Sequence, residues 1–141
     1  MSEEIRFTQS AVIPYRIKDK ELQILLITSI RRKKWIIPKG FIEFNFTAFE
    51  SAKKEAYEEA GAIGTNETKE LGFFISDKYD GDTKIIVYSM EVEELRDEYP
   101  EMNMRKRKWF PAEEAIDKIT IPEVGEMIKK LTAELSSASH L

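Results

Sequence analysis

The sequence contains no cysteine and only one histidine in 141 residues. The absence of cysteine excludes disulfide bonds, thiolate metal sites and cysteine nucleophiles together. His140 lies one residue from the end of the sequence, in a tail over 136–141 that we expect to be frayed. Histidine-based triads and histidine-rich zinc sites are therefore excluded as well.

Long apolar runs and a net positive charge are also missing. No apolar run approaches the length that spans a bilayer, and the first residues, MSEEIRF, lack the basic and apolar segments of a signal peptide. The formal net charge is −4, so the molecule as a whole does not attract nucleic acid or anionic membrane. We expect a cytoplasmic protein with no membrane or nucleic-acid partner. A polyanionic substrate would need local basic residues or a bridging metal ion.

The composition is that of an ordinary globular protein. Hydrophobic residues make up 42% and charged residues 34%, and the length suits one domain over 1–141. Residue patterns predict strands over 7–17, 22–28, 35–37, 70–77, 83–92 and 105–110, and helices over 47–60, 111–118 and from 122. Asp80-Gly81 predicts a hairpin turn. This order predicts a mixed sheet covered by helices, an α/β or α+β sandwich.

The helix predicted from Thr47 has clear ends. Thr47 and Glu50 stand in the S/T-x-x-E relation of a capping box. Gly61 suits the left-handed position just past a helix end. Alanines at every fourth position, from 48 to 60, form a smooth stripe that can pack closely against a sheet.

Three carboxylates, Glu55, Glu58 and Glu59, lie at i, i+3 and i+4 of this helix. Residues at that spacing are neighbours, and their like charges repel unless a positive group lies between them. A hard divalent cation with oxygen ligands would answer this need. The alternative is a solvated helix face, with Lys54 and Glu58 as an i, i+4 ion pair.

Residues 40–62 resemble the Nudix box, the signature of the Nudix hydrolases. The matching positions fall in register without a gap: Gly40, Glu55, Ala56, Glu58, Glu59, Gly61 and Ala62. Phe46 and Lys54 depart from the box, which has Glu and Arg there, and in the family those two residues often interact. The usual support of Glu55 is thus missing. The resemblance implies a Nudix-type α/β/α sandwich with a mixed sheet.

The resemblance also implies hydrolysis of a pyrophosphate bond by metal-activated water, with Mg²⁺, or Mn²⁺ in its place, as cofactor. It assigns Glu59 as the primary metal ligand and Glu55 and Glu58 as co-ligands, with Gly40 in the same metal site. Glu55, Glu58 and Glu59 together form the expected catalytic set, and Glu55 is also a candidate general base. Glu98 and Glu101, on a later loop, are further candidates for the base or an additional ligand.

The segment Trp35 to Gly40 and the basic residues 105–108 resemble the branch that acts on dinucleoside polyphosphates and diphosphoinositol polyphosphates. Lys39, Arg31 and Arg105 are the expected substrate-binding residues of such a phosphorylated small molecule. The basic cluster 31–34 suits an exposed turn equally well. Only alternate residues of a strand over 105–108 could face a substrate. Five aromatic residues could stack a base, although most such residues are core: Trp35, Phe41, Phe44, Tyr79 and Trp109.

Two other functions stay open at this stage. A non-catalytic Nudix-fold module that binds a nucleotide or a protein is favoured by Phe46 and Lys54 and opposed by the retained carboxylates. An RNA 5′-end pyrophosphohydrolase would share the chemistry, against the acidic net charge. The sequence leaves open the substrate, the general base, the number of metal ions and whether the protein is a homodimer.

Overall fold

A computed structural model describes residues 5–64, 70–79 and 81–137. The strands are β1 (Ile5–Lys18), β2 (Glu21–Thr28), β3 (Trp35–Ile36), β4 (Lys39–Phe41), β5 (Ala62–Ile63), β6 (Glu70–Tyr79), β7 (Gly81–Glu91), β8 (Glu94–Leu95) and β9 (Arg107–Pro111). The helices are α1 (Ala48–Ala60), α2 (Ala112–Lys118) and α3 (Pro122–Ser137). None of the helices in these ranges is long and apolar enough to cross a membrane.

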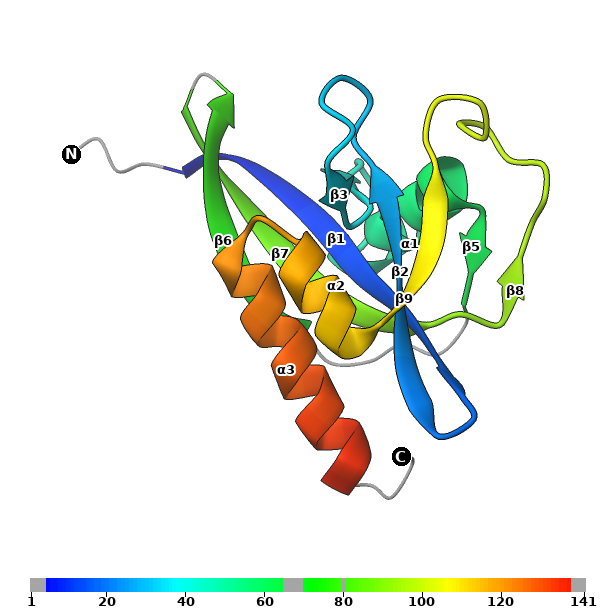
Figure 1. Cartoon of the computed structure of the whole chain (residues 1–141). Coiled ribbons are helices and arrows are strands. Elements are labelled where there is room, and N and C mark those ends of the chain that lie inside the picture. The colour runs from blue at the N-terminus through cyan, green and yellow to red at the C-terminus, as the bar shows by residue number, and fades with distance from the viewer. Residues whose placement is uncertain (1–4, 65–69, 80, 138–141) are drawn as a thin grey trace.

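Within the described ranges, seven strands form one mixed sheet in which β1 is central (Figure 1). β1 runs parallel to β7 over most of its length, and the other pairings are antiparallel. The opposite edge of β1 changes partner along the strand, because Gln9–Ala11 pair with β4 and Tyr15–Lys18 pair with β2. This change of partner brings β4, which leads into α1, beside the end of β2.

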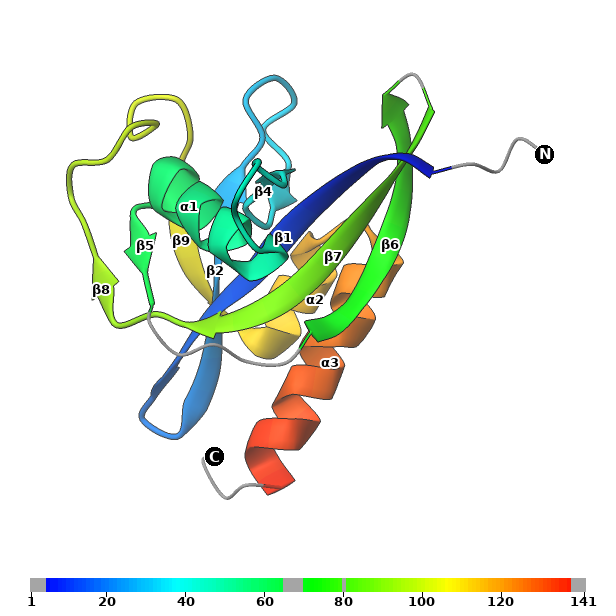
Figure 2. The same cartoon turned by 180° about the vertical axis from the view of Figure 1, so that it is seen from behind.

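The helices cover both faces of the sheet, with α1 on one face and α2 and α3 on the other (Figures 1 and 2). The alternation of a strand divides neighbouring residues between the two cores. On β1, Val12 belongs to the core under α1, whereas Ile13 belongs to the core under α3. The alanine stripe of α1 is buried in the first core. The arrangement confirms the predicted mixed sheet with helices on both sides.

The short elements correct the sequence prediction. Lys39 and Gly40, which follow the strand predicted over 35–37 and were expected to lie outside any strand, form strand β4 with Phe41. The acidic segment 93–104, which lies between the strands predicted over 83–92 and 105–110, contains β8, which pairs with β5. Residues 136 and 137 of the expected frayed tail are the last turn of α3. Asp80 and His140 lie outside the described residues.

Candidate functional site

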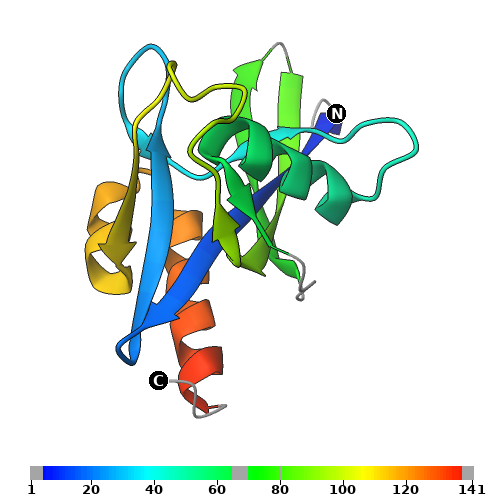
Figure 3. The same cartoon turned by 90° about the vertical axis from the view of Figure 1, so that its right-hand side faces the viewer.

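Helix α1 has the ends that the sequence predicts. Thr47 Oγ1 accepts the backbone N–H of Glu50, and the Glu50 side chain accepts the N–H of Thr47, so both halves of the capping box form. Gly61 ends the helix in the left-handed region at φ 67°. With both ends defined, the helix presents Glu55 and Glu59 toward β4. Figure 3 shows β4 and the loop after it running alongside α1.

Gly40 leaves the space that Glu55 occupies. A Cβ atom at position 40 would lie within 2.5 Å of Glu55 Oε2 and closer still to its Cδ. Any side chain there would therefore displace the carboxylate. Gly40 does not need a left-handed backbone, because its φ is not positive, and its role is the close approach of strand and acid.

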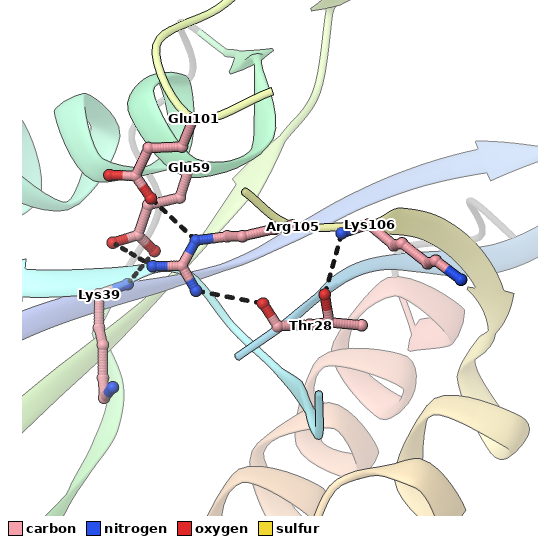
Figure 4. Close-up of polar contacts among 6 residues, drawn as sticks. All are labelled: Thr28, Lys39, Glu59, Glu101, Arg105 and Lys106. Atoms are coloured by element: carbon pink, nitrogen blue, oxygen red, sulfur yellow. Dashed lines mark hydrogen bonds and ion pairs between the residues drawn. The ribbon is translucent and has the colours of Figure 1, made fainter. Parts of the chain in front are cut away.

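Figure 4 shows Glu59 between Lys39 and Arg105. Its side chain is buried, with the residue only 7% exposed. The backbone N–H of Lys39 donates to its Oε1 at 3.3 Å, and Nη2 of Arg105 lies 3.8 Å from its Oε2. The sheet edge and the chain after the acidic segment thus both hold this carboxylate.

Arg105 ties Glu59 to Glu101 and to the end of β2. Its Nε donates to Glu101 Oε1 at 2.9 Å, and its Nη1 donates to the carbonyl oxygen of Thr28 at 3.2 Å. The side chain is 11% exposed. Arg105, expected to contact phosphate, therefore lies among the acids and supports them. Thr28 also accepts the backbone N–H of Lys106 through its hydroxyl at 2.9 Å.

Glu55 and Glu59 behave as a coupled acidic pair. Their side chains are hydrogen-bonded to each other. Burial raises the pKa of Glu59 to about 8, the nearby Glu55 adds to this rise, and Arg105 opposes it. Burial also raises the pKa of Glu55. Without a cation, the pair therefore tends to hold a proton at neutral pH.

This donor pair fits a hard divalent cation. Mg²⁺ is commonly held by one or two carboxylates together with substrate phosphates and water. A cation between Glu55 and Glu59 would replace their shared proton. In the described ranges, no three acidic, histidine or cysteine side chains converge as a ready-formed metal site. Glu58 is paired with Lys54, whose Nζ lies 3.2 Å from its Oε2, and its charge also raises the pKa of Glu55.

The other predicted residues divide between the site and the surface. Glu101 lies beside the acidic pair and raises the pKa of both members. Glu98 is exposed on the same loop. Arg31 is exposed in the β2–β3 loop. Figure 4 shows the Lys39 side chain directed away from Glu59, although its backbone N–H contacts that residue.

Both tryptophans pack within the fold. Trp35 contacts Phe110 edge to face at 5.0 Å, and the guanidinium of Arg16 lies 4.2 Å from the ring of Trp109. Phe41 and Phe44, by contrast, are exposed beside α1, Phe44 to 89%. These two are the aromatic candidates that remain accessible. The side chain of Tyr79 lies outside the described residues.

Arg107 is a site-supporting residue that the sequence reasoning did not single out. Its Nη1 donates to the carbonyl oxygens of Ala60 and Arg96, both at 2.8 Å. It thereby joins the end of α1 to the acidic segment, which also docks through the Glu101 N–H on the Glu58 carbonyl oxygen. The signal was the alternation of β9, which puts Arg107 on the α1 side with Trp109 and puts Lys108 on the other side with Phe110.

The sequence model of the NUDIX domain matches residues 7–131. Nudix hydrolase 13, mitochondrial, of Arabidopsis thaliana is 34% identical over 130 residues, a match that covers 77% of this chain and 64% of that protein. Human diphosphoinositol polyphosphate phosphohydrolase 2 is 32% identical over 126 residues, covering 86% and 68%. The chain thus spans about two thirds of the length of these relatives.

Solved structures share the fold at lower identity. A Caenorhabditis elegans Ap4A hydrolase binary complex superposes with a TM-score of 0.74 at 20% identity, covering 93% of this chain and 98% of that one. The NUDIX domain of Shewanella oneidensis NrtR, complexed with ADP ribose, gives 0.71 at 13% identity, covering 94% and 90%. At these identities the likeness concerns the fold alone.

Proposed function

This chain belongs to the NUDIX family, and from that premise we propose that it is a metal-dependent pyrophosphohydrolase. The reaction is hydrolysis of a pyrophosphate bond in a nucleoside diphosphate-linked or related diphosphate substrate. The observation that carries the proposal is the Glu55–Glu59 pair beside β4, in which Glu59 is buried and Glu55 is half-buried against Gly40. Two hydrogen-bonded carboxylates are costly to bury unless a proton or a cation lies between them.

Glu59 and Glu55 would hold Mg²⁺, or Mn²⁺ in its place, with Glu58 and the backbone at Gly40 next to them. When bound, the ion would neutralise phosphate charge and lower the pKa of a water molecule. Two groups keep the Glu59 carboxylate in place: the backbone N–H of Lys39, which donates to it, and the Arg105 guanidinium, which forms an ion pair with it. Glu55 is our choice of general base, because its raised pKa is nearer to neutral pH than that of an ordinary carboxyl group.

The substrate class we propose is a dinucleoside polyphosphate or a diphosphoinositol polyphosphate. Human diphosphoinositol polyphosphate phosphohydrolase 2 and the nematode Ap4A hydrolase, by their names, act on these two classes. The exposed residues Arg31 to Lys34 offer four positive charges for such an anion. Lys39 and Arg31 remain our proposed phosphate contacts. Arg105 would have to break its contacts with Glu59 and Glu101 to reach a phosphate.

A second candidate is a non-catalytic module that binds a nucleotide. The contact of Glu58 with Lys54 favours it, since this carboxylate already has a cationic partner in the protein. The NrtR domain that binds ADP ribose shows that the fold accommodates a nucleotide. An RNA 5′-end pyrophosphohydrolase has no specific contact in its favour. We propose a phosphorylated small molecule as the partner. We also propose a cytoplasmic location, which cell fractionation would test, and a homodimer, which analytical ultracentrifugation would test.

The test is a hydrolysis screen with Mg²⁺ over dinucleoside polyphosphates, diphosphoinositol phosphates, nucleoside diphosphate sugars and nucleoside triphosphates. We expect turnover of at least one class, abolished by EDTA. Glu59→Gln should lower kcat by roughly two orders of magnitude or more while the circular dichroism spectrum is retained, because the substitution is isosteric. No turnover of any substrate, together with nucleotide-induced stabilisation in EDTA, would support the binding module instead.

A further inference from the structure

The two departures from the Nudix box leave Lys54 without the acidic partner that the box normally supplies. Phe46 stands at that position, and its side chain is 40% exposed. Phe46 and Lys54 both line a shallow surface pocket of about 390 Å³ on the outer side of α1. The phenylalanine thus reaches the neighbourhood of the lysine but offers no charge.

Lys54 instead contacts an acid from outside the box pattern. Its Nζ lies 2.7 Å from Glu43 Oε2 and 3.2 Å from Glu58 Oε2, so one ammonium group is shared between two carboxylates. These contacts raise the pKa of Lys54, which keeps it positively charged. The three side chains are only partly exposed, with 40%, 39% and 30% of Lys54, Glu43 and Glu58 accessible.

The loop between β4 and α1 holds Glu43 in this place. The backbone N–H of Glu43 donates to Ser51 Oγ at 2.9 Å, and Ser51 is fully buried in the first turns of α1. The carbonyl oxygen of Glu43 accepts the N–H of Phe46 at 3.0 Å and closes a turn in which Asn45 takes the left-handed conformation, with φ 69°. Glu43 is therefore anchored to the same helix that carries Lys54.

Sharing the ammonium matters for Glu58. A Lys at i and a Glu at i+4 is the weaker order of such a helix pair. With Glu43 present, Glu58 receives only part of the lysine's attraction. Without Glu43, the whole ammonium would be available to Glu58, and it would neutralise this carboxylate beside Glu55 and Glu59.

We propose that Glu43 takes the part of the acidic residue missing at position 46. Glu43 acts through Lys54. By sharing the ammonium group, it positions the Glu58 carboxylate and leaves the negative charge of Glu58 available to a metal ion held by Glu55 and Glu59. Glu43 is thus a positioning residue that does not touch the substrate. The inference rests on the proposed function, because it assigns Glu58 to the metal site.

The test is Mn²⁺ binding, measured by electron paramagnetic resonance without substrate. We expect Glu43→Gln to weaken Mn²⁺ affinity about tenfold, the lower end of the effect of residues that orient metal ligands. Adding Phe46→Glu to Glu43→Gln should restore affinity, since position 46 lines the same pocket as Lys54. The matched control is Glu126→Gln, which breaks an exposed ion pair with Lys129 on α3. It should bind Mn²⁺ as the wild type does.

A second comparison asks whether Glu43 acts through Lys54. In a Lys54→Met background, Glu43→Gln should cause no further change in affinity. Wild-type affinity in Glu43→Gln, or an equal loss with and without Lys54, would overturn the inference. Wild-type protein that binds Mn²⁺ but hydrolyses no substrate would contradict the proposed function alone, and the affinity comparison would still decide the role of Glu43. Wild-type protein that binds no Mn²⁺ would overturn both.

Discussion

Gly40 and Glu55 show how a single missing side chain defines a functional position. The Glu55 carboxylate lies where a Cβ atom at position 40 would be, so strand β4 and helix α1 approach through the glycine. The space is available only because β4 pairs with β1 in the register that puts Gly40 opposite Ser10. A residue with no functional group therefore decides where an acid lies.

Gly40→Ala should displace Glu55 and lower kcat at least tenfold, because small displacements of reacting groups cost this much or more. The matched control is Gly125→Ala in α3, where a Cβ would meet Ile116 at 3.6 Å, an ordinary contact. That variant should keep full activity and gain about 0.4–1 kcal/mol of stability, the usual effect of replacing glycine in a helix. Kinetics and urea unfolding of both variants make the measurement; equal activities would contradict the role of Gly40.

The acidic pair also predicts how stability depends on pH. The pKa of Glu59 is about 8 in the folded protein, above its ordinary value of 4.5, so the folded state holds a proton that the unfolded chain has lost. Its contribution is fully present at low pH and is lost as pH rises through the folded value. We therefore expect the free energy of unfolding without metal to fall between pH of about 5 and about 8.

Glu59→Gln removes this titration and should flatten the fall. Urea unfolding in EDTA at a series of pH values measures both slopes. Added Mg²⁺ should restore stability mainly at the alkaline end, where it no longer competes with the proton. A fall of the same slope in Glu59→Gln and in the wild type would assign the pH dependence to other groups.

At the scale of elements, α1 is held at its C-terminal end by chain segments that are distant in sequence. The Arg107 guanidinium bonds the carbonyl oxygens of Ala60 and Arg96, and its charge is favourable at the end of a helix dipole. The same guanidinium lies 4.8 Å from the ring of Tyr99. The hydrogen bonds of Arg107 therefore connect α1, β9 and the acidic segment next to Glu58 and Glu59.

Arg107→Met should remove these hydrogen bonds and destabilise the protein by about 1–3 kcal/mol, the cost of leaving such acceptors unpaired. It should also lower activity, because Glu101 sits on the segment that loosens. Lys108→Met is the matched control, since Lys108 is exposed on the opposite side of β9, and its effect should stay within about 0.5 kcal/mol. Thermal unfolding measures the stability of the two variants, and turnover measures their activity. Similar losses in Arg107→Met and Lys108→Met would contradict the role of Arg107 in joining α1 to the acidic segment.

At the scale of the whole molecule, charge is unevenly distributed. The net charge is −4, yet the loop from Arg31 to Lys34 at the end of β2 is uniformly basic and exposed. This loop follows Thr28, whose carbonyl oxygen contacts Arg105. A positive loop therefore adjoins the acidic site, an arrangement that can attract a polyphosphate while the molecule as a whole remains acidic.

Arg31→Gln should raise KM for a polyphosphate substrate several-fold at low ionic strength and leave kcat unchanged, as expected when binding alone is weakened. The difference from the wild type should shrink as salt screens exposed charges. Lys20→Gln is the matched control, because Lys20 is exposed in the turn at the other end of β2, about 25 Å away for eight strand residues. Steady-state kinetics at several salt concentrations measure the effect. An equal change of KM in both variants would mean that the net charge of the protein, and not the position of Arg31, determines substrate binding.

Several elements could not be predicted because they depend on partners. β4 is a strand only because the 14-residue β1 is long enough to offer it an edge after β2 has diverged. The two-residue strands β5 and β8 exist only as a pair across the end of α1. None of β4, β5 and β8 has a periodic pattern long enough to predict a strand. The longer strands could be predicted because each has its own residue pattern, and α1 could be predicted because it has helical spacing and its own caps.

Local sequence patterns predicted the ends of α1, the spacing of Glu55, Glu58 and Glu59 along it, and the alternation of side chains in β9. Capping, helical spacing and strand alternation depend on residues near one another in the chain, which explains why these predictions held. The burial of Glu59 and its ion pair with Arg105, the space that Gly40 leaves for Glu55 and the pairing of Lys54 with Glu43 became visible only in the three-dimensional fold. Burial, pKa and ion pairing depend on segments that sheet pairing brings together, and no local pattern encodes those distances.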